Sequence, residues 1–533
     1  MIPLQPVALL LTDPQTLTAL EAAGLDVGAV AFGSARASDN AALAKDPGYA
    51  SVVATFARDL HELYDGDKAW GVGMRFAHRG FDVRWLTSPD TRWELAAVVN
   101  RVDRRVFTQP ASSTCGEVRL IYRLAGAESR LPATLNAVYF LPPDPPNGRA
   151  PACVAAAARF APPLTRAILD GATLKSVEID VQSVRWPSTV RPDLGGHAEY
   201  VLRVFKRPRS APAPLAPAPL EDVPDVARIA ADPALKRELL AFVRAHADDV
   251  NAGTLVVPER FLASRAVSVT PHGLARTQNR PWTRLFTVDD VRDFAGASPP
   301  AFLRRLDGLT CMGCHQSRSI AGFHVVGEER RVREADALAL GVSPHLEEDL
   351  PRRRAYVDAV LAGLPVDERR RAPEHEIDRG RFGDACGLGD AGFAAWACAP
   401  GFACAPVDDD VVGQCMPTAP AVGSACKPAP SCAPDDVCEG VPVGFPGGMC
   451  AAPCESTRDH ARCGAIAILT PFNECLARGR AFASCARENS RPASLRACGA
   501  EDPCRPDYIC AQPGVCLPPY FVLQMRVDGH VTP

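Results

Sequence analysis

The residues best suited to chemistry form one run, Cys311-Met312-Gly313-Cys314-His315. Two thiols three residues apart on one helical turn can add to the two vinyl groups at the edge of a porphyrin, and the imidazole that follows can bind the iron. This spacing therefore predicts covalent attachment of one haem c. Cys311 and Cys314 would be the attachment points and His315 the proximal iron ligand.

The same residues allow two simpler interpretations. The two thiols can form a local disulfide in an oxidised protein, or they can bind a tetrahedral zinc ion that His315 or His324 completes. Zinc sites usually supply a second pair of ligands at short spacing, and no such pair lies between residues 325 and 380. This observation favours haem over zinc and leaves the disulfide open.

The ligand on the other side of the iron is a separate question. The chain from Cys314 to Met416 contains no methionine between these two residues, so the sequence predicts a second histidine or an open site. His324 is the nearest candidate metal ligand, because nine extended residues after His315 span about 30 Å. Further candidates downstream are His345 and His375.

The residues before the motif predict a short helix. Ser298-Pro299-Pro300 is a helix start signal, and the apolar residues of 301–309 recur at helical spacing. In c-type cytochromes the haem-attachment pentapeptide likewise follows a short helix, and about forty residues around Cys311 resemble that arrangement. The resemblance implies an electron-transfer protein with a redox partner protein. An open distal site would permit peroxidase-type activity, so enzymatic activity stays open.

The first 205 residues predict an α+β domain. A chain of 533 residues is expected to form two to four domains. Several runs alternate between apolar and polar residues or are continuously apolar, as in an antiparallel sheet with one face in water. These runs are 81–86, 117–122, 135–140, 176–181 and 199–205. Residues 93–106 fit a strand or a helix. The role of residues 1–205 is not indicated by any catalytic motif.

A proline- and alanine-rich tract, 206–220, reads as a semi-rigid linker. Residues 221–380 then predict a small α-helical domain that carries the haem. Asp232 and Pro233 begin one helix, and Thr287 with Asp290 begins another with a capping-box pattern.

Residues 381–533 form a cysteine-rich region that holds 16 of the 20 cysteines. Three groups repeat, each with one cysteine followed by a trio whose first gap is five residues. The groups are Cys386 with Cys398, Cys404 and Cys415; Cys426 with Cys432, Cys438 and Cys450; and Cys498 with Cys504, Cys510 and Cys516. They resemble the Dickkopf-like or growth-factor-like repeats of secreted proteins. The resemblance implies disulfide-stapled modules with little secondary structure, whose connectivity the sequence does not give.

The compartment follows from the same cysteines. Dense disulfides and covalent haem both indicate a periplasmic, outer-surface or secreted protein, and Cys115 and Cys153 are candidates for one further bridge. No signal peptide is visible after Met1, so we expect the natural start to lie upstream. The net charge of −4 gives no indication of nucleic-acid binding, and no apolar run is long enough to cross a membrane.

Two functions are therefore predicted for this multidomain α+β chain. The first is an exported mono-haem, c-type cytochrome-like protein that transfers electrons. The alternative is a secreted or cell-surface disulfide-rich binding protein without haem, whose C-terminal repeats contact a partner at the cell surface or envelope. The redox partner and the reduction potential are not indicated by the sequence.

Overall fold

A computed structural model describes the fold of most of the chain up to residue 417 and of short strands beyond it. The described residues are 7–34, 36–37, 39–69, 81, 83–107, 114–126, 130–143, 153–184, 198–208, 214–270, 280–314, 323–327, 342, 344–369, 379–380, 385–400, 402–406, 410–417, 437–439, 449–451, 509–511 and 515–517. His315, His375 and most of the third cysteine repeat lie outside these residues.

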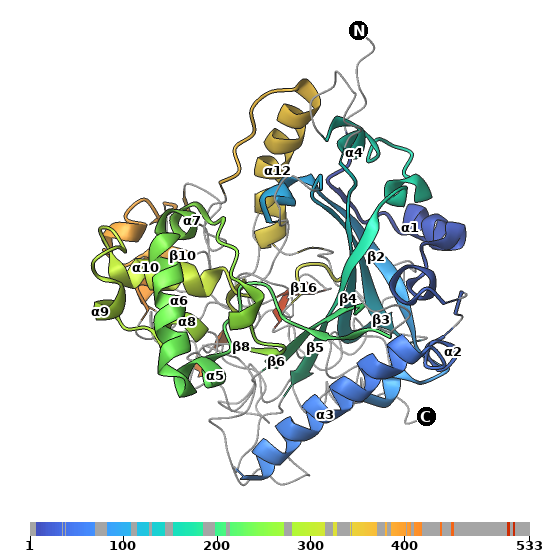
Figure 1. Cartoon of the computed structure of the whole chain (residues 1–533), viewed down its shortest axis with the longest axis horizontal. Coiled ribbons are helices and arrows are strands. Elements are labelled where there is room, and N and C mark those ends of the chain that lie inside the picture. The colour runs from blue at the N-terminus through green and yellow to red at the C-terminus, as the bar shows by residue number, and fades with distance from the viewer. Residues whose placement is uncertain are drawn as a thin grey trace, which may run out of the picture.

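An eight-stranded antiparallel sheet dominates the first half of the chain, as predicted (Figure 1). Its strands are β1 (Leu10–Leu11), β2 (Arg92–Arg101), β3 (Glu117–Ala125), β4 (Arg130–Phe140), β5 (Thr173–Val184), β6 (Ala198–Lys206), β7 (Ala216–Ala218) and β8 (Ala266–Thr270). β1 to β7 follow in chain order, and β8 pairs with β6 beside β7. The ambiguous run at 93–106 is mostly β2.

One predicted strand was wrong. Residues Val83–Leu86 form a 3-10 helix instead. The carbonyl of Trp85 accepts a hydrogen bond from Asn40 at 2.9 Å and another from Thr91, so it is used by side chains instead of a neighbouring strand. A short apolar run cannot be assigned by periodicity alone.

The proline- and alanine-rich tract also differs from the predicted linker. Ala216–Ala218 forms β7 and pairs with Val204, Phe205 and Lys206 of β6. Proline is accepted here because β7 lies at an edge of the sheet, where no further strand needs its missing N–H. Since β8 also joins β6, the sheet continues through this tract into the segment predicted to be helical. The division into folding units stays a prediction.

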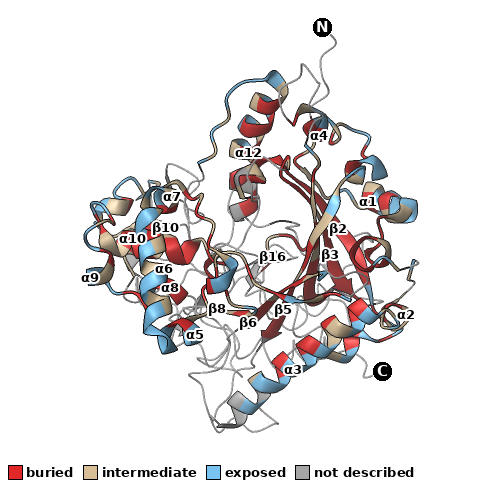
Figure 2. Cartoon of the chain, viewed as in Figure 1, coloured by how far each residue is buried: buried red, intermediate tan, exposed pale blue. Residues whose placement is uncertain are grey.

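Both faces of the central strands are buried (Figure 2). One face packs on a large apolar core that includes Phe56 of α3 (Pro47–Ala69) and Val357 of α12 (Pro344–Ala362). The other face carries charged and polar residues, but the motif turn and the segment 323–327 cover it. The expectation of a face in water was therefore wrong.

The helical part forms a separate core between 226 and 309. Asp232 caps α6, Thr287 and Asp290 form a capping box on α9, and Ser298 caps α10, as predicted. Besides α3 and α12, the α-helices among the described residues are α1 (Pro14–Leu20), α2 (Asn40–Leu43), α4 (Val154–Ala158), α5 (Val226–Ala231), α6 (Pro233–Ala245), α7 (Ala247–Ala252), α8 (Pro281–Leu285), α9 (Val288–Val291), α10 (Pro299–Gly308) and α11 (Cys311–Cys314). Among the described residues, none of the helices has the length and apolar character needed to span a membrane.

The cysteine-rich region is built from short strands. They are β9 (Arg379–Gly380), β10 (Ala385–Gly387), β11 (Ala397–Cys398), β12 (Phe402–Pro406), β13 (Val412–Pro417), β14 (Val437–Glu439), β15 (Met449–Ala451), β16 (Ile509–Ala511) and β17 (Val515–Leu517). In each repeat the last two cysteines lie opposite each other across an antiparallel pair. The opposed cysteines are Cys404 and Cys415, Cys438 and Cys450, and Cys510 and Cys516. This shared register supports the predicted repeat.

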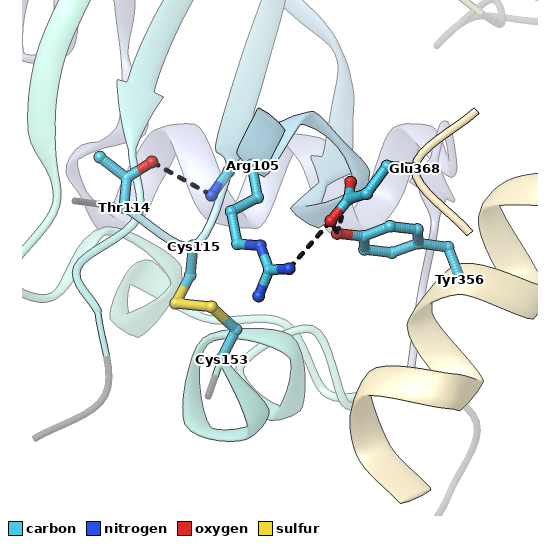
Figure 3. The surroundings of a disulfide bond; sticks show 7 residues. Arg105, Thr114, Cys115, Cys153, Tyr356 and Glu368 are labelled. Atoms are coloured by element: carbon cyan, nitrogen blue, oxygen red, sulfur yellow. Dashed lines mark hydrogen bonds and ion pairs between the residues drawn. A yellow bond between two sulfur atoms is a disulfide. The ribbon is translucent and has the colours of Figure 1, made fainter. Parts of the chain in front are cut away.

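Disulfides brace the described chain. Cys115 pairs with Cys153, as the sequence suggested, and Cys386 pairs with Cys404. Figure 3 shows the first bridge beside Arg105, whose guanidinium lies 2.9 Å from Glu368. Tyr356 of α12 donates to the same carboxylate at 3.2 Å. These contacts tie α12 and the segment after it to the 3-10 helix Val102–Phe107, which follows β2.

Candidate functional site

Cys311 and Cys314 lie on α11, a single turn that follows α10 after Thr310. The Thr310 hydroxyl donates to the carbonyl of Asp307 at 2.6 Å and accepts from the N–H of Gly313 at 3.1 Å. The N–H of Cys314 donates to the carbonyl of Thr310 at 2.9 Å. Thr310 therefore caps the turn that presents the two thiols.

Close packing holds this turn on two sides. A Cβ atom on Gly313 would lie 2.2 Å from the carbonyl oxygen of Asp307, so the position requires glycine. On the other side, Ser268 of β8 donates from its hydroxyl to the carbonyl of Met312 at 2.9 Å. Because β8 pairs with β6, these contacts fix the thiols relative to the sheet.

The two motif cysteines are reduced and do not form a disulfide with each other. The Sγ atom of Cys311 lies 3.8 Å from the carbonyl oxygen of Glu221. Burial, reinforced by the negative charge of Glu178, raises the pKa of the Cys311 thiol well above its usual value. Cys311 is therefore protonated at neutral pH unless a bound cation displaces its proton.

His324 is the predicted ligand that the structure brings to the cysteines. Its Nε2 atom lies 3.5 Å from the Sγ atom of Cys314. His315 lies outside the described residues, so its role as proximal ligand stays a prediction. The structure therefore brings the imidazole of His324 to the thiol of Cys314, whereas the thiol of Cys311 lies against the carbonyl of Glu221.

The segment 323–327 holds His324 in place. The Phe323 ring packs edge-on against Tyr200 of β6, with 6.2 Å between ring centroids. Val325 pairs with Val342 in an isolated β-bridge. Gly327 has a φ of +74°, and a Cβ atom there would lie 2.8 Å from the Cβ of Ala96. These neighbours seat the segment on the polar face of the sheet.

A cavity of about 260 Å³ separates this site from the sheet. Cys311, Cys314 and His324 line it on one side, and residues of β2 to β6 line it on the other. The volume is slightly below the about 300 to 1,000 Å³ of small-molecule pockets. Seven arginine and lysine side chains and four aspartate and glutamate side chains form part of its wall. The cavity is therefore small, partly open and lined by many charged side chains.

A buried ion cluster lies below Cys311. The carboxylate of Glu117 is within 3.1 Å of Arg104, 3.0 Å of Arg119 and 2.6 Å of Lys175. Burial alone would raise the pKa of Glu117, but these three cations outweigh it and hold the pKa well below its usual value. Glu221 pairs with Arg104 at 2.5 Å and with Lys175. The backbone of Glu221 thus connects this cluster to the thiol of Cys311.

Sequence reasoning missed this cluster. The signal was present, because Glu117 and Arg119 on β3, and Ser176 and Glu178 on β5, are polar residues at every second position of otherwise apolar strands. That pattern ordinarily indicates a face in water. The segments that cover the face come from residues 308–353, and single-sequence periodicity does not reveal which segment covers which face.

A covalent haem fits the donor set only in part. Two unlinked thiols on one helical turn beside a cavity are what attachment requires. In such a haem the thioether sulfurs are at the edge of the porphyrin, whereas an axial ligand lies over its centre. His324 cannot contact Cys314 and bind the iron at once, so it would have to move to become the distal ligand.

A tetrahedral metal ion fits the same contact directly. Zinc binds sulfur at about 2.3 Å and imidazole nitrogen at about 2.1 Å, and tetrahedral angles then place the two ligand atoms about 3.6 Å apart. The observed 3.5 Å between Cys314 and His324 matches this spacing. The ligand atoms of Cys311, Cys314 and His324 do not all lie within 4.8 Å of one another, so Cys311 would have to move, and one further ligand would be needed, to complete such a site.

A second group of cysteines is excluded as a metal centre. The sulfur atoms of Cys386, Cys398 and Cys404 lie within 4.8 Å of one another. Cys386 and Cys404 are bonded to each other, however, and Cys398 is also part of a disulfide. Oxidised sulfurs are not the thiolate ligands that metals bind.

Comparisons with known proteins give no assignment for this site. No protein-family model, curated protein or solved structure matches the chain. The function must therefore be argued from the geometry around Cys311 and Cys314.

Proposed function

We propose that this chain is an exported c-type cytochrome-like protein that carries one haem on Cys311 and Cys314, with His315 as its proximal ligand. The observation that supports this proposal most is the pair of unlinked thiols on one capped helical turn, facing a cavity. When bound, haem supplies one-electron chemistry at its iron. Electron transfer to a redox partner protein is the simplest use of it, because no catalytic constellation was recognised in the sequence.

The residues of this chain would have distinct tasks in that protein. Thr310 and Gly313 position the thiols for attachment. A porphyrin is too large for the cavity of about 260 Å³, so it would enter this site only if the segments that cover the sheet moved outward; the apolar side chains of Ile121 and Leu202 would then help to exclude water. Exclusion of water and the nearby charges set the reduction potential.

Export to an oxidising compartment is part of the same proposal. The bridges Cys115–Cys153 and Cys386–Cys404 support it, because disulfides of this kind persist outside the reducing cytosol. The C-terminal repeats contain hairpins with opposed cysteines, which support the alternative function, binding of a surface partner by that region. A binding role for the repeats is compatible with haem elsewhere in the chain.

A second candidate function is a metal site on Cys314 and His324, which Cys311 would join by moving toward them. The 3.5 Å contact between Cys314 and His324 favours it, because ligands of one tetrahedral ion have this spacing. Such a site would brace the segment 323–327 against α11 and would be structural. His315 is available in sequence as the fourth ligand.

One experiment separates these candidates. The full chain is exported from two otherwise matched bacterial hosts, with and without c-type haem maturation machinery, and both preparations are assayed by pyridine haemochrome spectra and elemental analysis. The haem proposal predicts one haem per chain only in the first host. One zinc per chain in both hosts, without haem, would support the metal site and overturn the haem proposal. The double variant Cys311→Ser/Cys314→Ser is the control and should lose either group.

A further inference from the structure

A second ion cluster borders the same cavity where α12 meets β2. Asp103 lies 2.9 Å from Arg101 and 2.8 Å from Arg352. Asp349 lies 2.6 Å from both Arg352 and Arg353. Three guanidinium groups therefore share two carboxylates. Among the described residues of this cluster, one positive charge is in excess.

Arg353 carries the clearest sign of this excess. Its side chain is 6% exposed and lines the cavity together with Arg101. The Nε atom of Arg353 pairs with Asp349, but its buried Nη1 atom has no hydrogen-bond partner among the residues that the structure describes. A buried donor without a partner lowers stability, because it has lost its hydrogen bonds to water and gained none in the protein. A bound acceptor in the cavity would remove that cost.

The charge on Arg101 indicates the same deficit of negative charge. Burial, and next the positive charge of Arg353, lower the pKa of Arg101 to about 9, against the opposing effect of Asp103. Two guanidinium groups thus destabilise each other at the cavity wall. An anion between them would relieve this repulsion.

Polar groups of the sheet line another part of the cavity. Asn136 of β4 and Ser176 of β5 lie on the same face of the sheet, because Asn136 is opposite Glu178 and Ser176 is two residues before it. The buried atoms Oδ1 of Asn136 and Oγ of Ser176 have no hydrogen-bond partner among the described residues. An amide oxygen accepts hydrogen bonds, so it calls for a donor on the ligand.

We propose that this cavity binds a small carboxylic acid that also carries a hydroxyl or amino group. The carboxylate would bind Arg353 and Arg101, because the planar guanidinium fork matches two carboxylate oxygens. The hydroxyl or amino group would face Asn136 and Ser176. The volume of about 260 Å³ limits the ligand to a few carbon atoms.

This inference does not rest on the proposed haem. A haem would bring carboxylates of its own, so the test uses the full chain with Cys311→Ser and Cys314→Ser, which cannot attach one. Binding of a free acid to that protein identifies the cavity itself as the site. Loss of binding on these two changes would assign the carboxylate site to an attached haem and overturn the inference.

The first test is calorimetric titration with malate at constant ionic strength set by chloride. The inference predicts one saturable site and at least a tenfold weaker affinity in Arg353→Gln, because hydrogen bonds to charged groups contribute about 1.5–3 kcal/mol. Arg354→Gln is the matched control, since the neighbouring Arg354 is 35% exposed and is not part of the cavity wall. Arg353→Lys keeps the charge without the fork and should be intermediate. It provides the comparison if Arg353→Gln does not fold.

The second test compares malate with succinate, which lacks the hydroxyl group. The inference predicts tighter binding of malate, and loss of that preference when Asn136 is changed to Leu and Ser176 to Ala. Equal affinity of the unchanged protein for both acids would show that Asn136 and Ser176 do not bind the hydroxyl group. Absence of malate binding, or an equal loss of affinity in Arg353→Gln and Arg354→Gln, would overturn the whole inference.

Discussion

The Nε2 atom of His324 lies 3.5 Å from the Sγ atom of Cys314, ten positions earlier in the chain. The contact brings an imidazole to the attachment motif from a segment that is seated independently on the sheet by Phe323 and Val325. Replacing His324 is therefore a direct test of whether the two thiols carry a haem or a metal ion.

Replacing His324 by alanine should leave a covalent haem attached but change its ligation. If His324 moves to become the distal ligand, the variant loses the visible spectrum of a six-coordinate iron and binds cyanide or imidazole more readily. His246→Ala is the control, because His246 is 43% exposed and pairs with Asp249 at a distant helix end. An unchanged spectrum in His324→Ala would remove His324 from the ligand set.

Gly313→Ala should displace the turn that carries the thiols. Its Cβ atom would lie 2.2 Å from a backbone oxygen of Asp307, which cannot rotate away as a side chain would. We expect a loss of about 1–3 kcal/mol in the free energy of unfolding, together with a lower yield of attached group. Urea denaturation and haem content measure the two effects. Met312→Leu conserves the side-chain volume at the preceding residue and should lower the free energy of unfolding by less than about 1.5 kcal/mol.

The ion cluster around Glu117 should control stability in acid. The folded pKa of Glu117 is held well below its usual value of 4.5, so its contribution is complete above that pH and is lost as pH falls through the folded pKa. Glu117→Gln leaves buried cations without their partner and should cost about 3–5 kcal/mol at pH 7. Urea denaturation from pH 7 to pH 3 should therefore show a weaker pH dependence in the variant.

An exposed ion pair supplies the comparison for Glu117. Glu259 is 71% exposed and lies 3.0 Å from Lys206. Glu259→Gln should change the free energy of unfolding by less than about 1 kcal/mol. Similar losses in the two variants would contradict a special role for the buried cluster.

Asp222 should have the opposite pH dependence. Burial raises its pKa from 3.8 to about 7, so the folded protein binds a proton that the unfolded chain has lost, and stability falls as pH rises from about 4 to 7. Asp222→Asn should remove this loss and stabilise the protein at pH 8 by about 1 kcal/mol or more. Asparagine also tolerates the φ of +56° at this position. Thermal unfolding at pH 5 and pH 8 tests the prediction, and equal shifts at both pH values would contradict it.

The sequence predicted local features better than how segments pack together. Four strands, the caps at Asp232 and Ser298, and the bridge between Cys115 and Cys153 follow from residue types at short spacing, and the structure has them. Residue types at short spacing do not reveal which segments cover the polar face of the sheet, because that depends on contacts between residues more than a hundred positions apart. Glu117 therefore read as a solvated residue although it is fully buried.

The candidate site shows the same division. The spacing of Cys311 and Cys314 indicated their chemistry, and His324 was selected by its reach alone. The cavity, the buried cations around it and the excess charge at Arg353 come from five strands, β2 to β6, and α12 meeting in space. No local pattern places Arg353 beside Arg101, since 252 positions separate them in the numbering.

The most direct test of the haem proposal is the intact mass of the denatured full chain, after export from a host with c-type haem maturation machinery. The account predicts the mass of one haem added to the chain, located by peptide mapping on Cys311 and Cys314 and absent from Cys311→Ser/Cys314→Ser. An unmodified mass, with Cys311 and Cys314 recovered as free thiols or linked to each other, would contradict it.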